Sequence, residues 1–163
     1  MIWEGMLLEG LTVTRAVQDR YGTAHRNPSN EIECGDHYAR SMASCGVFLA
    51  ACGFKYNRPK QHISFVPRLS PENFKCACMS AEGWSAFSQK TESGKLTAEI
   101  AVRWGRLNLK TLALESATGN AVSASHGERR VAAKLARDGK RILISFETAV
   151  AITAGEKLEI VPS

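Results

Sequence analysis

The densest group of polar side chains lies within residues 26–44, around the expected start of a helix. Its members are Glu31, Glu33, Asp36, His37, Tyr38 and Arg40. We expect Glu31 and Glu33 in a loop that can aim their carboxylates, and Arg40 in the second helical turn, able to reach back toward that loop. Carboxylates accept and a guanidinium donates hydrogen bonds in fixed directions, which suits recognition of sugar hydroxyls. Two neighbouring carboxylates also allow the acid and base roles of a glycosidase.

A structural interpretation of the same residues stays open. Polar residues at a helix start commonly cap the helix. Glu33 and His37 are four residues apart and can form a local pair on a helix. Under this interpretation the group stabilises the helix start and binds no ligand.

The cysteines give a weaker signal for a metal site. Cys76 with Cys78 could form one half of such a site, and Cys34 with His37 the other. Zinc sites usually separate paired cysteines by about two to four residues and need a second pair of matching quality. We therefore predict no metal and no cofactor, with the five cysteines reduced.

Two apolar helices are expected in the first third of the chain. Apolar residues recur at mostly helical spacing over residues 2–21, and Gly22 is a plausible stop. A second helix is predicted from Asp36, as its N-cap, to about Gly53, with little charge along most of its length. Two such helices cannot bury their apolar faces against each other alone, so we expect further elements to pack against them.

The pattern changes after Gly53 to short strands and turns. Prolines break the stretch 57–83, which we expect to be an irregular connection with one short strand at residues 62–66. Further strands are expected at residues 95–104, 107–114, 131–137, 141–146 and 157–161. Hairpin connections are expected at residues 92–94, 105–106 and 138–140, the last carrying the Asp-Gly pair. The sequence thus predicts an antiparallel β-sandwich of six to eight strands over residues 84–163.

Charge and hydropathy narrow the class of protein. The chain has 163 residues and a formal net charge of +5, and its basic residues look like solvated strand and turn charges. We therefore expect no nucleic-acid partner. No apolar run reaches the ~18 residues of a membrane span, and the N-terminus lacks the pattern of a secretory signal. We expect a soluble, cytoplasmic protein with no transmembrane segment.

One long string resembles a known enzyme family. It reads Asn-Glu-Ile-Glu-Cys-Gly-Asp-His-Tyr-Ala-Arg-Ser-Met-Ala-Ser over residues 30–44, with Asn27-Pro28 before it and Glu82-Gly83-Trp84 and Phe87-Ser88-Gln89 after it. The string resembles the C-terminal part of glycoside hydrolase family 116, which includes the non-lysosomal glucosylceramidases and bacterial β-glucosidases. The resemblance covers residues 2–89 well and the remainder more loosely.

This resemblance implies an (α/α)6 toroid and a retaining glycosidase that acts on β-linked glucosides. The family's nucleophile, a Glu, and its acid/base, an Asp, come from segments upstream of the matching stretch, so this chain contains no catalytic residue. Glu31 and Arg40 fall on positions that resemble glucose-hydroxyl contacts. Glu33, His37 and Tyr38 belong to the same string, and we assign them to supporting the loop. Met1 is then expected to be an internal methionine of a longer parent, the chain being a truncated or split gene product.

The sequence therefore predicts an α+β chain with three parts. Residues 1–56 form the last helices of an incomplete (α/α)6 toroid, residues 57–83 a connection, and residues 84–163 the sandwich. The expected function is that of a C-terminal fragment of a β-glucosidase, inactive alone, which binds a β-glucoside together with the missing N-terminal portion as a possible separate chain. The alternative is a non-catalytic carbohydrate-binding or structural β module that docks on a partner chain through its helices. Trp84 and Trp104 are either a sugar-stacking platform or ordinary core residues.

Overall fold

The computed structural model describes residues 1–20, 42–117 and 119–163. The chain divides into two compact units, Met1–Ala51 and Cys52–Ser163. We call the first the helical unit and the second the β unit, and each is described by itself. The two units together fit the α+β class that the sequence predicts.

The helical unit contains a 3-10 turn, η1 (Ile2–Glu4), the helix α1 (Leu7–Gln18) and nearly all of α2 (Met42–Cys52). Ile2 is buried and lies close to Gly10 of α1. Any larger residue at position 10 would collide with the Ile2 side chain. The helix predicted over residues 2–21 is thus present in two pieces. The expected start of the second helix, Asp36, lies outside the described residues. No helix in the described residues is both long and apolar enough to cross a membrane.

The β unit is built from ten strands in its described residues. They are β1 (Lys55–Asn57), β2 (His62–Ser64), β3 (Asn73–Ser80), β4 (Gly83–Glu92), β5 (Lys95–Glu115), β6 (Val122–His126), β7 (Arg129–Val131), β8 (Ala133–Asp138), β9 (Arg141–Thr153) and β10 (Lys157–Pro162). Two of the predicted hairpins are confirmed. Ser93 and Gly94 connect β4 to β5 with positive φ angles of 50° and 79°, and Gly139 with Lys140 connects β8 to β9.

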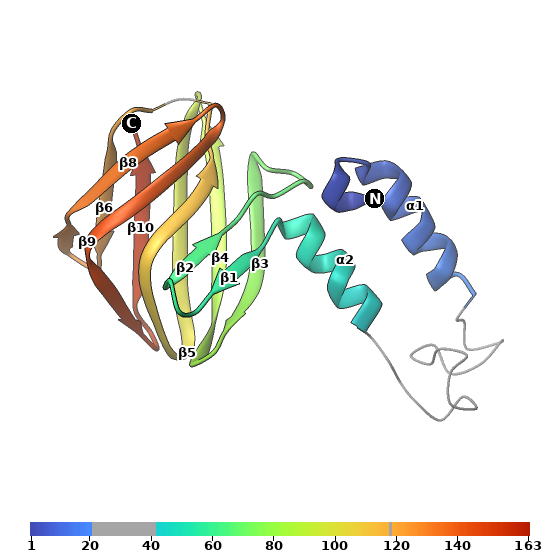
Figure 1. Ribbon diagram of the computed structural model, residues 1–163, viewed down its shortest axis with the longest axis horizontal. Coiled ribbons are helices and arrows are strands. Elements are labelled where there is room, and N and C mark those ends of the chain that lie inside the picture. The colour runs from blue at the N-terminus through green and yellow to red at the C-terminus, as the bar shows by residue number, and fades with distance from the viewer. Residues whose placement is uncertain (21–41, 118) are drawn as a thin grey trace. The chain divides into compact units, whose positions relative to one another are not determined.

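The long strand β5 belongs to two layers of strands (Figure 1). Its first half pairs with β4 and β10, in a layer ordered β3-β4-β5-β10-β6-β7. Its second half pairs with β2 and β9, in a layer ordered β1-β2-β5-β9-β8. The pairing of β2 with β5 is parallel, so the sheet as a whole is mixed. The pairings among the described strands of residues 83–163 are antiparallel, as the sequence predicts for this part of the chain.

The core of the β unit fills the space between these two layers. Phe65 and Phe87 are fully buried, and their rings stack at a centroid distance of 3.8 Å. Aliphatic side chains from both layers surround them: Ile100, Leu109, Leu112, Leu114, Ile142, Ile144, Ile152, Leu158 and Ile160. Burial of this many large apolar side chains gives the β unit a core of its own.

Three expectations about the β region need correction. The stretch 57–83 is not an irregular connection with one strand, because the eight residues of β3 lie in it and pair along their full length with β4. Gly105-Arg106 is not a hairpin turn, because β5 continues through both residues. The strands expected at residues 95–104 and 107–114 are one strand, β5, and β6 and β7 were not predicted, although the seven strands in the described part of residues 83–163 agree with the six to eight expected.

Candidate functional site

The polar group that the sequence predicts as a sugar site lies outside the described residues. Its members are Glu31 and Arg40 as sugar contacts, with Glu33, His37 and Tyr38 in support. Their assignment stays a prediction. A functional site in the described chain has to be sought elsewhere.

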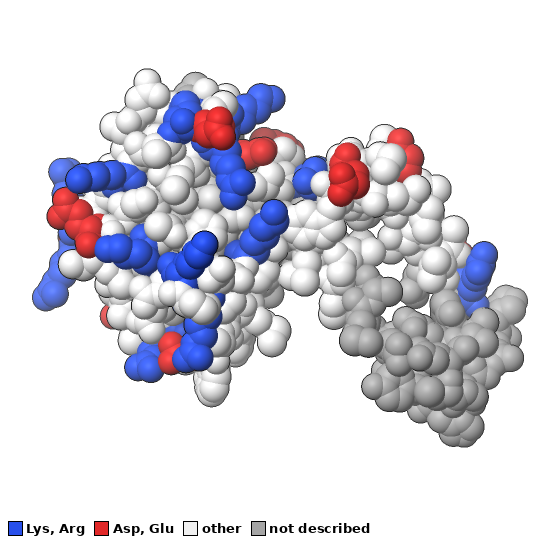
Figure 2. All heavy atoms as spheres, viewed as in Figure 1, with Lys and Arg blue, Asp and Glu red and all other residues white. Residues whose placement is uncertain are grey.

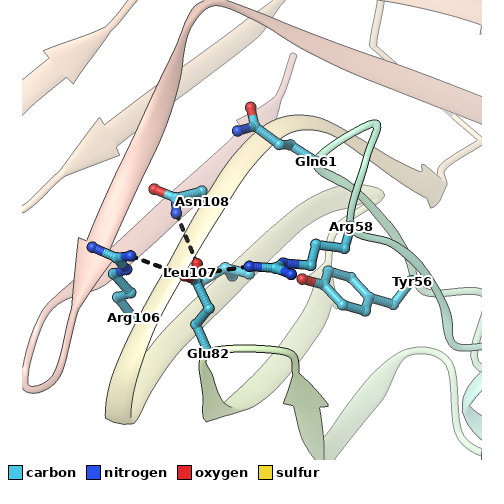
Figure 3. A pocket seen from close by; sticks show the side chains of 7 residues that line it. All are labelled: Tyr56, Arg58, Gln61, Glu82, Arg106, Leu107 and Asn108. Carbon is cyan, nitrogen blue, oxygen red and sulfur yellow. Dashed lines mark hydrogen bonds and ion pairs between the residues drawn. The ribbon is translucent and has the colours of Figure 1, made fainter.

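A polar cavity of about 210 Å³ lies in the β unit, where the β3–β4 turn approaches the β1–β2 connection and β5. Figure 3 shows the side chains around it. It is lined by Tyr56, Arg58, Gln61, Glu82, Arg106, Leu107 and Asn108. All but Leu107 carry hydrogen-bonding side chains, so the cavity suits a polar ligand.

Glu82 is the centre of this group. Arg106 Nη2 donates to Glu82 Oε1 at 2.9 Å, and Asn108 Nδ2 donates to Oε2 at 3.1 Å. Arg58 Nη2 lies 3.7 Å from Oε1, on the opposite side of the carboxylate in Figure 3. The carboxylate is thus held between two guanidinium groups and an amide while about 28% of its side chain remains exposed.

Two glycines bring Glu82 and Arg106 together. Gly83 and Gly105 face each other across β4 and β5, and Gly105 adopts a positive φ of 71°. A side chain at Gly105 would collide with the Glu82 carbonyl oxygen, which accepts a hydrogen bond from the Arg106 backbone N–H at 3.0 Å. Glycine within a strand often marks such a close approach of two backbones.

The electrostatics of the site keep Glu82 ionised. The hydrogen bond from Arg106 is the largest cause that lowers the pKa of Glu82, and the charges of Arg106 and Arg58 act in the same direction. The hydrogen bond with Glu82, followed by the charge of Glu82, raises the pKa of Arg106. A carboxyl group with a lowered pKa is a poor general acid at neutral pH. Glu82 is also the only carboxylate among the lining residues, so the cavity lacks the two carboxylates of a glycosidase centre.

A second, more open hollow of about 600 Å³ lies over β2, β5, β8 and β9. Its lining includes Lys60, His62, Thr111 and Arg141. His62 Nδ1 and Thr111 Oγ1 share a hydrogen bond of 2.8 Å. Burial, followed by the charges of Arg141 and Lys60, lowers the pKa of His62, which is therefore neutral at pH 7. Arg137 and Asp138 also line the hollow, so its walls carry a carboxylate beside the basic side chains.

The cysteine pair that could form half of a metal site is buried in the core. Burial raises the pKa of Cys78 to about 12, and its thiol donates to the Ser85 carbonyl oxygen at 3.6 Å. A hydrogen bond with Cys52, followed by burial, raises the pKa of Cys76. Metals bind thiolates, so these protonated thiols are poor ligands. Within residues 1–20, 42–117 and 119–163, no group of three or more His, Cys, Asp or Glu is placed to hold a metal ion.

The two tryptophans that the sequence leaves between two roles are exposed. Trp84 is 49% and Trp104 64% exposed, and the two residues are register partners on β4 and β5. They are therefore not core residues.

The Glu82 cavity was not found by sequence reasoning. Its residues come from β1, the β1–β2 connection, the β3–β4 turn and β5, so their spacing in the chain carries no recognisable motif. The available signal was Gly83 together with Gly105, two glycines in strand-forming sequence. Gly105 was instead interpreted as a turn.

Comparison with known proteins leaves the family open. No family model and no curated protein matches the sequence. Among solved structures, an alpha-L-rhamnosidase from Dictyoglumus thermophilum is a weak neighbour, with a TM-score of 0.42 and 12% sequence identity. The match covers 74% of this chain but only 13% of that chain. A likeness at this level assigns neither a family nor an activity.

Proposed function

We propose that this chain is the C-terminal portion of a family 116-like glycoside hydrolase. Its helical unit would supply the last helices of an (α/α)6 toroid with part of a glucose subsite, and its β unit would follow as a sandwich module. The observation that carries the proposal is the order of parts. The string at residues 30–44 leads into α2, and β1 begins three residues after α2 ends.

The exposed apolar residues of the helices support this proposal. Leu8, Val13 and Val17 of α1 are exposed, as are Phe48 and Leu49 of α2. Helices of a soluble protein normally bury such residues against further elements. Additional toroid helices would provide that cover.

The proposed glucose subsite rests on Glu31 and Arg40. An ionised carboxylate accepts hydrogen bonds from sugar hydroxyls, and a guanidinium donates to them, which together fix the orientation of the ring. Glu33, His37 and Tyr38 would hold the loop in place. The parent enzyme would retain configuration by double displacement, with two carboxylates about 5 Å apart that come from its upstream segments.

A chimera tests the proposal. The C-terminal portion of a bacterial family 116 β-glucosidase is replaced, from the position that aligns with residue 2, by this chain, and hydrolysis of an aryl β-glucoside is measured. We expect the chimera to be active and the chain alone to be inactive. E31Q and R40Q should each lower kcat/KM of the chimera by about tenfold or more, because each removes a charged hydrogen bond to the sugar.

Matched controls are the exposed residues Glu128 and Arg129, at the β6–β7 turn. E128Q and R129Q remove the same charges from the β unit, at residues that are not part of the proposed subsite, and should leave kcat/KM unchanged. A folded chimera without activity, shown to be folded by circular dichroism, contradicts the proposal. So does turnover by the purified chain alone.

A second candidate function is a non-catalytic module that docks on a partner chain. The same exposed residues of α1 and α2 favour it, since a partner protein could cover them as well as toroid helices could. It becomes the better explanation if the chimera folds and does not hydrolyse the glucoside.

A further inference from the structure

We propose that Trp84 and Trp104 form a platform on the β unit that binds the pyranose rings of a neutral polysaccharide, with the Glu82 cavity as its polar end. This site lies entirely within residues 56–108 and is separate from the predicted subsite at Glu31 and Arg40. It does not depend on the proposed glycosidase function.

A β-bulge places Trp104 on the surface. Ile100 and Val102 face the core from β5, so strict alternation would turn Trp104 inward as well. The register passes from Trp84–Trp104 to Ser85–Val102, which makes Arg103 an extra residue on β5. The extra residue reverses the alternation, and Trp104 points outward beside Trp84.

The two indoles are available for stacking. As register partners on adjacent antiparallel strands, Trp84 and Trp104 have Cβ atoms about 5 Å apart. Met79 of β3 is the partner of Trp84 on the other side and is 76% exposed, so the apolar row continues over three strands. Within the described residues, neither indole N–H donates to a protein acceptor, which leaves both free to donate to a ligand hydroxyl. Flat aromatic surfaces with a polar edge suit the apolar faces and hydroxyl rims of sugar rings.

The Glu82 cavity supplies polar groups next to this platform. Glu82 is two residues from Trp84 along the chain, and Arg106 is two residues from Trp104. In each pair the two Cα atoms therefore lie at most about 7 Å apart. The cavity offers carboxylate acceptors from Glu82, guanidinium donors from Arg58 and Arg106, and both kinds of group from Gln61 and Asn108. These are the partners that vicinal hydroxyls need.

The charge of the cavity favours a neutral ligand over a nucleic acid. The β unit carries 17 Lys and Arg against 10 Asp and Glu, a net +7, and Figure 2 shows Lys and Arg spread over its visible face. Bases could also stack on tryptophans beside such a surface. At this site, however, Arg58 and Arg106 are engaged by Glu82, and its carboxylate would repel a phosphate. A neutral sugar meets no such penalty.

The test is affinity electrophoresis of the full chain in native gels that contain hydroxyethyl cellulose, laminarin or soluble xylan. We expect at least one of these neutral polysaccharides to retard the wild-type chain. W84A and W104A should each weaken that retardation about tenfold or more, whereas W84F and W104F should retain much of it. W3A is the matched control, because Trp3 is also exposed but lies in the helical unit.

Three outcomes would overturn the proposal. One is the absence of retardation in all three polysaccharides. Another is retardation that W84A and W104A leave unchanged while both variants remain folded by near-ultraviolet circular dichroism. The third is tryptophan-dependent binding of a thymidine oligonucleotide in place of a polysaccharide, which would assign the platform to nucleic acid.

Discussion

Glu82 shows how the surroundings of one residue limit its chemistry. Both of its carboxylate oxygens accept hydrogen bonds, from Arg106 and Asn108, and Arg58 lies within ion-pair distance. In this environment the group serves as a fixed acceptor and not as a proton donor. The same pairing links protonation of Glu82 to the stability of the β unit.

The effect of replacing Glu82 should therefore depend on pH. Because the pKa of Glu82 is lower in the folded chain than its ordinary value of 4.5, the carboxylate stabilises the fold above pH 4.5. That contribution is lost as the pH falls through the lowered pKa. We expect E82Q to unfold at a lower temperature than wild type at pH 7, with the difference shrinking as the pH falls below 4.5. Thermal melts of both proteins from pH 7 to pH 3 measure this.

The control for this experiment is E128Q, which removes an exposed carboxylate that is not part of the hydrogen bonds and ion pairs around Glu82. Its difference from wild type should stay small throughout the pH range. A constant difference between E82Q and wild type down to pH 3 would show that the ion pairs of Glu82 do not contribute to stability.

At the scale of elements, β5 determines both the layers and the surface sites. Its core-facing residues are Leu96, Ala98, Ile100, Val102, Leu107, Leu109, Leu112 and Leu114. Successive core-facing residues are two positions apart in the sequence, except for a step of five positions after Val102 and a step of three after Leu109. Each odd step reverses the face that the strand presents, and each coincides with a register shift against a neighbouring strand or with Gly105. The step after Val102 lies where the strand passes from the layer of β4 and β10 to the layer of β9, and the step after Leu109 lies at a register shift against β9.

Gly105 should tolerate substitution much less than Gly94. Both adopt a positive φ, of 71° and 79°, but only Gly105 lies against another backbone segment. We expect G94A to cost about 1 to 2 kcal/mol through strain alone. G105A should cost clearly more, because its methyl group would also push away the Glu82 carbonyl. Urea unfolding of both variants measures the difference, and equal losses would contradict the described contact.

Local turn chemistry could be predicted from the sequence, whereas pairing between distant strands could not. The Ser93-Gly94 and Gly139-Lys140 connections are decided by residues within the turn itself. Gly105 carries the same local signal, yet its conformation serves a bulge and a close backbone contact with Glu82. The Glu82 cavity depends on such non-local pairing, and for this reason it was missed although the exposed tryptophans were considered.

At the scale of the whole molecule, the two units differ in charge and in core. The helical unit contains 4 Lys and Arg against 6 Asp and Glu, a net −2, in contrast to the +7 of the β unit. The large buried side chains belong to the β unit, while several apolar residues of the helical unit are exposed. The β unit therefore has the features of a domain that folds by itself.

We expect a chain that starts at residue 52 to fold without the helical unit. Calorimetry should show a single cooperative transition, at the temperature at which the β unit unfolds in the full chain. Cys52 has to be kept, because its side chain is buried in the β core and its carbonyl accepts a hydrogen bond from the Val66 N–H. A shortened chain without a cooperative transition would show that the β unit needs the helices.

The position of β10 has a consequence for synthesis on the ribosome. This strand lies between β5 and β6 and pairs with both, and in the described residues β6 and β7 reach the rest of their layer through it. While residues 157–162 are still inside the exit tunnel, β3, β4 and β5 can already form hairpins outside it. The β6–β7 pair cannot join the layer by strand pairing until residues 157–162 emerge. The nascent chain therefore carries an open edge on β5 until β10 has left the tunnel.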